Sequence, residues 1–178
     1  MPERTVSSRR AFSGRLLGLR VDEVELESGR RASREVVEHP GAVAILAWDG
    51  EQLAAVRQWR QAAGADLLEI PAGTLEPGEE PLLTAQRELA EECGLAAGQW
   101  VEGPVFYTAP GFSTELLTLF LATDLHRVDV APPDDEALER SWLTLPDALD
   151  VIDAGGIRDA KSLVGILWLD RHLSAERS

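Results

Sequence analysis

Three glutamates at helical spacing are the residues of this sequence best suited to chemistry. Glu88, Glu91 and Glu92 stand at positions i, i+3 and i+4, so on a helix they share one adjacent arc. Like charges at this spacing destabilise a helix by roughly 0.2–0.5 kcal/mol per pair. A divalent cation that prefers oxygen ligands would relieve that repulsion. The cluster therefore indicates either a metal site or a solvated acidic helix face.

The flanking residues predict a helix from Pro81 to Gly94. Proline suits the first helical position and glycine suits the residue that follows the last turn. At about 100° per residue one apolar stripe runs along this helix, and we expect it to be buried. Its members are Leu82, Ala85, Leu89 and Cys93.

The glutamates belong to a longer pattern that begins at Gly73. Glu79 follows, and then come Arg87-Glu88-Leu89, Glu91-Glu92 and Gly94-Leu95 at the spacing G-x5-E-x7-R-E-U-x-E-E-x-G-U, in which U is apolar. A chance match is on the order of one in a billion per start position. The pattern is the full Nudix box, so the chain resembles the Nudix hydrolases and the metal-site interpretation is favoured over a solvated acidic face. A Nudix fold that has lost its activity is the alternative.

Length and charge limit the class of protein. A chain of 178 residues suits one domain with a substantial core. A net charge of -14 argues against electrostatic binding of nucleic acid, and it leaves an anionic substrate to local arginines and bound metal. The single Cys93 fits a reducing cytoplasm. We expect no signal peptide and no membrane association, because no apolar run is long enough to span a bilayer.

Residues 1–40 predict an N-terminal extension made of strands. Residues 1–18 are polar and basic with few apolar anchors, whereas 20–27 and 34–38 form a predicted β-hairpin around Gly29. A two-stranded hairpin is marginal in water, so it should pack on something, and a second subunit is one candidate.

Residues 41–178 predict the main domain, in which strands and helices alternate. Helices are expected at 81–94, 146–154 and 159–172. Strands are expected at 42–48, 52–58, 66–70, 100–107, 116–123 and 141–145. The predicted class is α/β, with a mixed sheet between helices (α/β/α), as in Nudix domains.

Hydrolysis of a pyrophosphate bond suits these residues, because divalent cations spread the phosphate charge and activate water. Glu88 and Glu92 are one helical turn apart and are the best pair to bind metal, and Glu91 is either a further ligand or their tuning partner. The resemblance adds the backbone carbonyl of Ala72. It also implies Mg2+ as the cofactor, with Mn2+ or Zn2+ as possible substitutes.

Arg87 stands at i, i+4 to Glu91, so we expect it to orient that carboxylate rather than to react directly. Glu79 either holds the loop or reaches the metal through water. The resemblance implies a general base on a loop after the box, where the sequence offers Asp134, Asp135, Glu136 and Glu139. Glu136 is preferred, because Glu139 lies at the edge of the next strand. A solvated loop carboxylate is the alternative for Glu136.

Three features outside the box resemble the ADP-ribose pyrophosphatases. Pro110 follows Leu95 by fifteen residues, Leu67–Gly73 matches L-L-E-x-P-A-G, and Ile157–Leu163 matches I-x-D-A-K-[ST]-L. The resemblance implies Mg2+-dependent hydrolysis of ADP-ribose to AMP and ribose 5-phosphate. It also implies a homodimer that exchanges its N-terminal strands.

The same resemblance implies roles for substrate-binding residues. Arg60 would grip the diphosphate bidentately, and Glu115, in the loop of Pro110, would reach the terminal ribose. Phe12 or Arg34 from a partner subunit would stack on adenine, unless Phe12 is only an anchor and Arg34 only a strand-surface charge. Two rival functions stay open: hydrolysis of another nucleoside diphosphate sugar or flavin adenine dinucleotide, and non-catalytic sensing of ADP-ribose.

Overall fold

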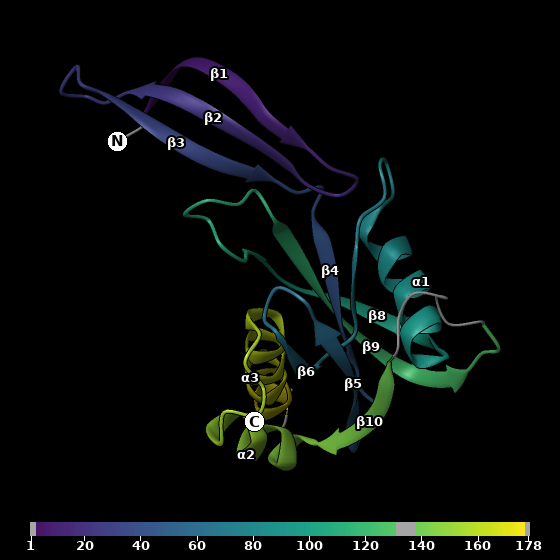
Figure 1. Cartoon of the computed structure of the whole chain (residues 1–178). Coiled ribbons are helices and arrows are strands. Elements are labelled where there is room, and N and C mark those ends of the chain that lie inside the picture. The colour runs from purple at the N-terminus through teal and green to yellow at the C-terminus, as the bar shows by residue number, and fades with distance from the viewer. Residues whose placement is uncertain (1–2, 131–137, 177–178) are drawn as a thin grey trace. The chain divides into compact units, whose positions relative to one another are not determined.

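The computed structural model describes residues 3–130 and 138–176 (Figure 1). The chain divides into two compact units. The first comprises residues 1–41 and 106–116, and the second comprises residues 42–105 and 117–178. Each unit is described by itself.

The first unit is built on a three-stranded antiparallel sheet in the order β1-β2-β3. The strands are β1 (Arg4–Ser13), β2 (Gly18–Glu25) and β3 (Arg31–Glu38). The predicted hairpin is present as β2 and β3, which pair from Gly18↔Glu38 to Glu25↔Arg31. Strand β1 was not predicted, because all ten of its residues are exposed and no buried side chain alternates along it.

The loop between residues 106 and 116 is attached to the end of β3. The Val37 amide donates to the Phe112 carbonyl at 2.7 Å, and the Thr114 amide donates to the Val37 carbonyl at 3.0 Å. The His39 amide adds a hydrogen bond to Thr114 Oγ1 at 2.9 Å. The loop that carries Pro110 is therefore fixed by backbone hydrogen bonds to Val37 of β3, within the first unit.

The second unit contains two sheets. One has the order β7-β4-β9-β8, in which β4 pairs parallel with β9 and antiparallel with β7, so it is the mixed sheet that the sequence predicts. The other is antiparallel, with the order β10-β5-β6. Their bounds are β4 (Ala42–Ala47), β5 (Gln52–Arg60), β6 (Ala65–Glu69), β7 (Ala72–Thr74), β8 (Leu95–Tyr107), β9 (Leu116–Arg127) and β10 (Glu139–Thr144).

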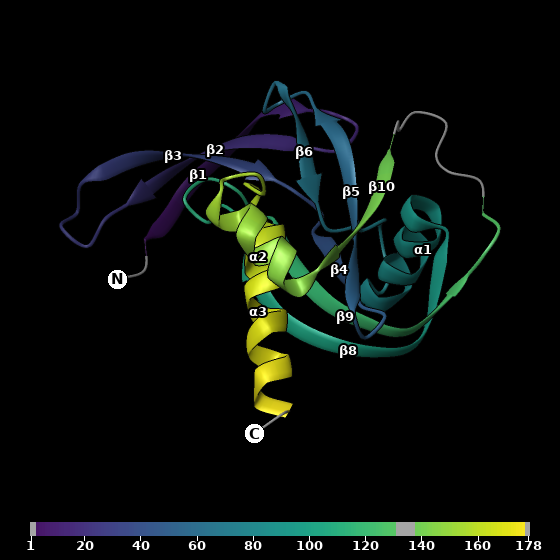
Figure 2. The same ribbon diagram turned by 90° about the horizontal axis from the view of Figure 1, so that it is seen from below.

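Strand β4 forms the centre of the core, and all six of its residues are buried. Val43 and Ile45 pack in one cluster with Leu89 of helix α1 (Pro81–Cys93). On the other side Leu46 lies beside Gly165 of helix α3 (Ala160–Glu176). The two helices therefore cover opposite faces of the mixed sheet, and α2 (Leu145–Asp153) packs beside α3 (Figure 2). This is the predicted α/β/α arrangement.

Helix α1 begins and ends as the sequence predicts, at Pro81 and before Gly94, whose φ of 65° is left-handed. The predicted apolar stripe is wrong at Leu82, which is 38 % exposed, whereas Thr84 is buried. Glu92 is also buried, with 3 % of the residue exposed. The buried arc of the helix is therefore rotated toward its acidic side.

Candidate active site

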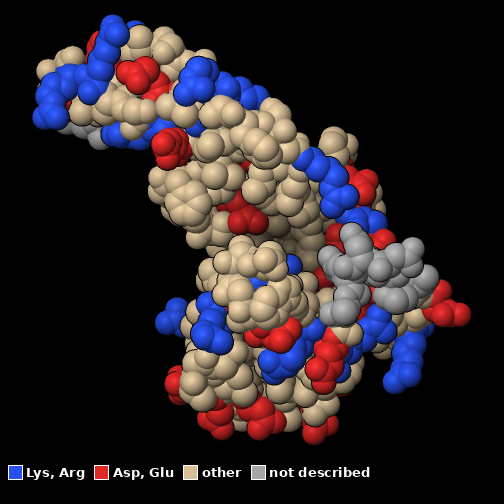
Figure 3. Space-filling model, viewed as in Figure 1, with Lys and Arg blue, Asp and Glu red and all other residues tan. Residues whose placement is uncertain are grey.

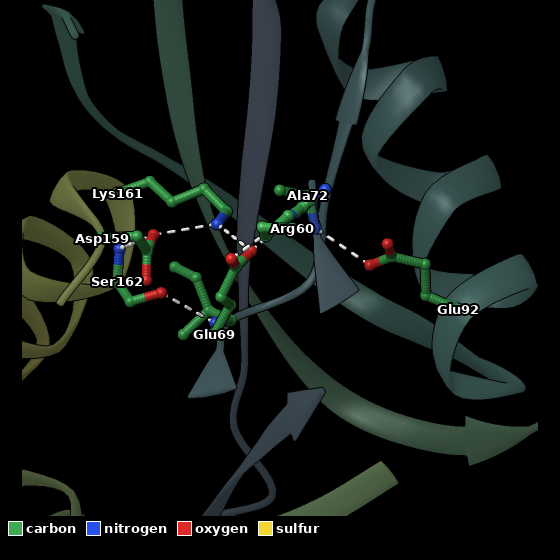
Figure 4. Close-up of polar contacts among 8 residues, drawn as sticks. Arg60, Glu69, Ala72, Glu92, Asp159, Lys161 and Ser162 are labelled. Carbon is green, nitrogen blue, oxygen red and sulfur yellow. Dashed lines mark hydrogen bonds and ion pairs between the residues drawn. The ribbon is translucent and has the colours of Figure 1, made fainter. Parts of the chain in front are cut away.

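Glu92 and Ala72, both predicted to bind metal, are neighbours in the structure. The buried carboxylate of Glu92 accepts a hydrogen bond at 3.0 Å from the backbone amide of Ala72, the first residue of β7 (Figure 4). Helix α1 supplies the carboxylate, and the pairing of β7 with β4 holds the backbone. Tertiary packing thus brings together two residues that are twenty positions apart.

Gly73 brings a third predicted ligand to the same place. A Cβ atom added at Gly73 would overlap the carboxyl group of Glu88. Only glycine lets this side chain lie against the β7 backbone. Ala72, Glu88 and Glu92 therefore surround the same short stretch of main chain.

Arg87 contacts three carboxylates at once. Its Nε and Nη2 donate to Glu79 at 3.2 and 3.1 Å, while Nη1 donates to Glu88 at 2.7 Å and to Glu91 at 3.1 Å. The hydrogen bonds from Arg87 lower the pKa of Glu79 to about 2. The guanidinium thus offsets repulsion within the acidic face and holds its members in fixed positions.

The donor atoms at this site suit a hard divalent cation, since they are carboxylate and carbonyl oxygens. Within residues 3–130 and 138–176, however, no three acidic, histidine or cysteine side chains are gathered as a ready-made metal site. The carboxylates of Glu88 and Glu91 instead pair with Arg87, at 2.7 and 3.1 Å.

Arg60, predicted to bind a diphosphate, lies at the end of β5. Its Nε and Nη2 donate side-on to the buried carboxylate of Glu69 at 3.0 and 2.6 Å. The Nζ atom of Lys161 lies 2.5 Å from the same carboxylate. Sequence reasoning noted the segments that contain Glu69 and Lys161 but did not foresee that they form an ion pair across 92 positions.

Two predicted substrate residues, Arg34 and Pro110, line one hollow of about 930 Å³ within the first unit. Tyr107 and Phe112 also line it, with exposed fractions of 57 % and 60 %. Arg34 is held by Glu3 through contacts of 3.0 and 2.5 Å. Sequence reasoning missed the two aromatic residues, although their positions beside Pro110 were a usable signal.

Glu115, predicted to reach a ribose, lies near the end of the loop that carries Pro110. Its carboxylate accepts a hydrogen bond from the Thr108 hydroxyl and lies 3.7 Å from His39 Nε2. His39 Nδ1 accepts from the Gly41 amide at 3.1 Å, so Nε2 is the ring nitrogen that faces Glu115. Glu115 is therefore oriented by two polar side chains.

The other predicted residues are separate from these groups. Phe12 lies on β1, is 58 % exposed and does not line the hollow. Glu136, the preferred general base, lies outside the described residues, while Glu139 is the exposed first residue of β10.

Charged side chains of both signs stand on the visible surface of β1–β3 (Figure 3). No single-sign surface covers these strands in that view. Among the described residues, no helix is long and apolar enough to cross a membrane.

Comparison with known families identifies the chain. The model of the NUDIX domain matches residues 38–163. The chain belongs to the Nudix family. The model of the nucleoside diphosphate sugar hydrolase N-terminal domain matches residues 3–37 of this Nudix protein.

Curated relatives match the Nudix chain over most of its length. ADP-ribose pyrophosphatase of Bacillus subtilis (strain 168) is 41 % identical, over 95 % of this chain and 93 % of the relative. Methanol dehydrogenase activator of Bacillus methanolicus is 40 % identical, over 94 % and 92 %. ADP-ribose pyrophosphatase of Mycobacterium tuberculosis (strain ATCC 25618 / H37Rv) is 40 % identical, over 92 % and 81 %.

A solved structure described as an ADP compounds hydrolase has the same fold. It superimposes with a TM-score of 0.88 and covers 99 % of this chain and 96 % of its own, at 20 % identity. The predicted Nudix fold is therefore confirmed.

Proposed function

We propose that this Nudix protein hydrolyses the pyrophosphate bond of ADP-ribose, giving AMP and ribose 5-phosphate, with Mg2+ as its cofactor. The observation that carries the proposal is the gathering of Glu88 and Glu92 against Ala72 and Gly73. The names of the relatives from Bacillus subtilis and Mycobacterium tuberculosis supply the substrate.

Different residues of the chain would have different roles in such a reaction. A bound divalent cation spreads the negative charge of the diphosphate and lowers the pKa of a bound water. Glu88, Glu91, Glu92 and the Ala72 carbonyl would hold it. Arg87 orients the carboxylates, and its links to Glu79 and Glu91 limit their movement.

The remaining roles follow from position and charge. Arg60, fixed by Glu69, would bind the diphosphate. Pro110 and Arg34 line a hollow whose aromatic members, Tyr107 and Phe112, suit the flat face of a base. Glu136 would take the proton from the attacking water, with Glu139 as the competing candidate.

We also propose a homodimer that exchanges its N-terminal strands. Strand β1 is exposed along its full length, and Val6, Phe12, Leu16 and Leu17 are exposed apolar side chains of the first unit. A second subunit would cover this surface and bring Phe12 or Arg34 to the adenine of its partner's substrate. The proposed location is the cytoplasm, because Cys93 is the one cysteine of the sequence.

A second candidate function is hydrolysis of another nucleoside diphosphate sugar. The match of residues 3–37 to the nucleoside diphosphate sugar hydrolase N-terminal domain favours it. It would keep every assignment in the second unit and change only the pocket of the first.

The test is a turnover panel with purified protein and Mg2+. It compares ADP-ribose, ADP-glucose, GDP-mannose, flavin adenine dinucleotide and NADH, and it identifies both products. We expect the highest kcat/KM for ADP-ribose, loss of turnover with a chelator, and loss of most turnover in Glu92→Gln. Preference for another diphosphate would move the substrate assignment. Binding of ADP-ribose without turnover of any compound would make the protein a sensor.

A further inference from the structure

The segment Ile157–Leu163 has no role in the reaction proposed above. The structure places it beside the turn Glu69–Ala72, which includes the proposed metal ligand Ala72. Lys161, near the start of α3, contacts Glu69 at the end of β6 (Figure 4). Glu69 is 2 % exposed and holds two cations, Lys161 and Arg60. Burial alone would raise the pKa of Glu69, but the hydrogen bonds and charges of Arg60 and Lys161 outweigh burial and lower it.

The start of α3 is itself braced. Asp159 Oδ1 accepts from Lys161 Nζ at 2.8 Å and from the Ser162 amide at 3.1 Å. The Ser162 hydroxyl, fully buried, accepts from the backbone amide of Ile70 at 2.9 Å. Helix α3 thus contacts two successive residues, Glu69 through the charge of Lys161 and Ile70 through the hydroxyl of Ser162.

The turn from Glu69 to Ala72 is held from two sides. Pro71 has no amide hydrogen, so the turn offers the amides of Ile70 and Ala72. The Ile70 amide donates to Ser162 of α3, and the Ala72 amide donates to Glu92 of α1. The Pro71 carbonyl accepts from Ile45 of β4 at 2.8 Å. In Figure 4 the cluster around Glu69 and the carboxylate of Glu92 lie on either side of Ala72.

The buried carboxylate of Glu69, paired with two partly exposed cations, is weak evidence for a gain in stability alone. Apolar residues of similar volume commonly stabilise a core as well or better, because burying charges is costly. The gain from such a cluster is fixed geometry, and the geometry fixed here is that of the backbone whose carbonyl is a candidate metal ligand.

We propose that Lys161 and Ser162 are positioning residues for the cation site: through Glu69 and Ile70 they set the place of the Ala72 backbone against Glu92. This inference rests on the proposed function. The class of ligand is a divalent cation with oxygen ligands. Both residues would act through their contacts with Glu69 and Ile70.

The test measures binding of Mn2+ or Mg2+ to the full-length protein without substrate, by calorimetry or by electron paramagnetic resonance for Mn2+. The variants are Lys161→Met and Ser162→Ala, with Lys161→Arg as the conservative exchange. Arg158→Met is the matched control, since it removes a positive charge from an exposed position of the same segment. Thermal unfolding of the metal-free proteins is recorded in parallel.

We expect the Kd for the cation to rise about tenfold or more in Lys161→Met and Ser162→Ala, as for other residues that orient metal ligands. Lys161→Arg should recover most of the affinity, and Arg158→Met should bind as the wild type does. In Lys161→Met the Glu69 carboxylate keeps its hydrogen bonds from Arg60. The double variant Glu69→Gln/Lys161→Met removes both charges of the Lys161 ion pair, and its cation affinity should stay weak whatever its melting temperature.

The outcomes separate the two proposals. Wild-type affinity in both Lys161→Met and Ser162→Ala would overturn the positioning role, as would affinity that merely follows the melting temperature across the series. A wild-type protein that binds no cation would overturn the metal site and this inference together. Cation binding with no turnover of ADP-ribose would overturn the substrate assignment alone.

Discussion

Replacing Gly73 by alanine should separate the activity of this protein from its stability. The added Cβ would overlap the terminal atoms of Glu88, which belong to a flexible side chain rather than to backbone. Glu88 would have to withdraw by more than about 1 Å to reach ordinary van der Waals contact. Such a movement is easy for the fold but displaces a predicted metal ligand.

The expected magnitudes follow from this geometry. A misplacement of about 1 Å in a reacting constellation can cost on the order of 100-fold in rate, so Gly73→Ala should lower kcat by about that factor. The free energy of unfolding should fall by no more than about 1 kcal/mol, or roughly 2–4 °C in Tm for a chain of this size. The assays are steady-state hydrolysis of ADP-ribose and thermal unfolding of the metal-free protein.

A double-mutant cycle with Glu88→Ala makes the test specific. The atoms that the new Cβ would overlap are Cγ, Cδ and Oε1 of Glu88, and alanine lacks all three. Gly73→Ala should therefore add little to the loss of activity already caused by Glu88→Ala. Multiplicative losses in the double variant, or near-normal turnover in Gly73→Ala, would refute the reasoning.

Two further predictions concern acidic residues. Glu136→Gln should lower kcat about 100-fold or more while KM changes little, because a general base acts on the attacking water; a larger loss in Glu139→Gln would assign the base to Glu139 instead. For Glu79, the folded pKa of about 2 lies below its ordinary value of 4.5, so its contribution to stability is present above pH 4.5 and is lost as the pH falls through about 2. Urea unfolding of wild type and Glu79→Gln should therefore differ most above pH 4.5 and converge toward pH 2, whereas a difference that is constant with pH would exclude the ion pair with Arg87 as its source.

The sequence was sufficient where structure depends on near neighbours. Helix α1 lies between Pro81 and Gly94 as predicted, because proline and glycine act on their own backbone angles. The apolar run 42–48 predicted a strand, and β4 is present over Ala42–Ala47 with all six residues buried. The spacing of the box also identified the family, which the match to residues 38–163 confirms.

The local sequence pattern was insufficient for an exposed strand and for the direction in which a helix is buried. Strand β1 was missed because its side chains are exposed throughout and carry no alternating signal. Leu82 was placed in the core by periodicity, yet it is exposed. The buried arc of the helix includes Glu92, whose carboxylate accepts from the Ala72 amide twenty positions away.

The sequence by itself determined which acidic residues are candidates for metal binding and which helix carries them, because both depend on spacing within a few turns. Only the tertiary structure placed Glu69 against Lys161 and Ile70 against Ser162, each pair 92 positions apart. No periodicity encodes a contact at that separation. It arises because β4 buries both of its faces, which forces α1 and α3 onto opposite sides of one sheet and closes them around the same turn.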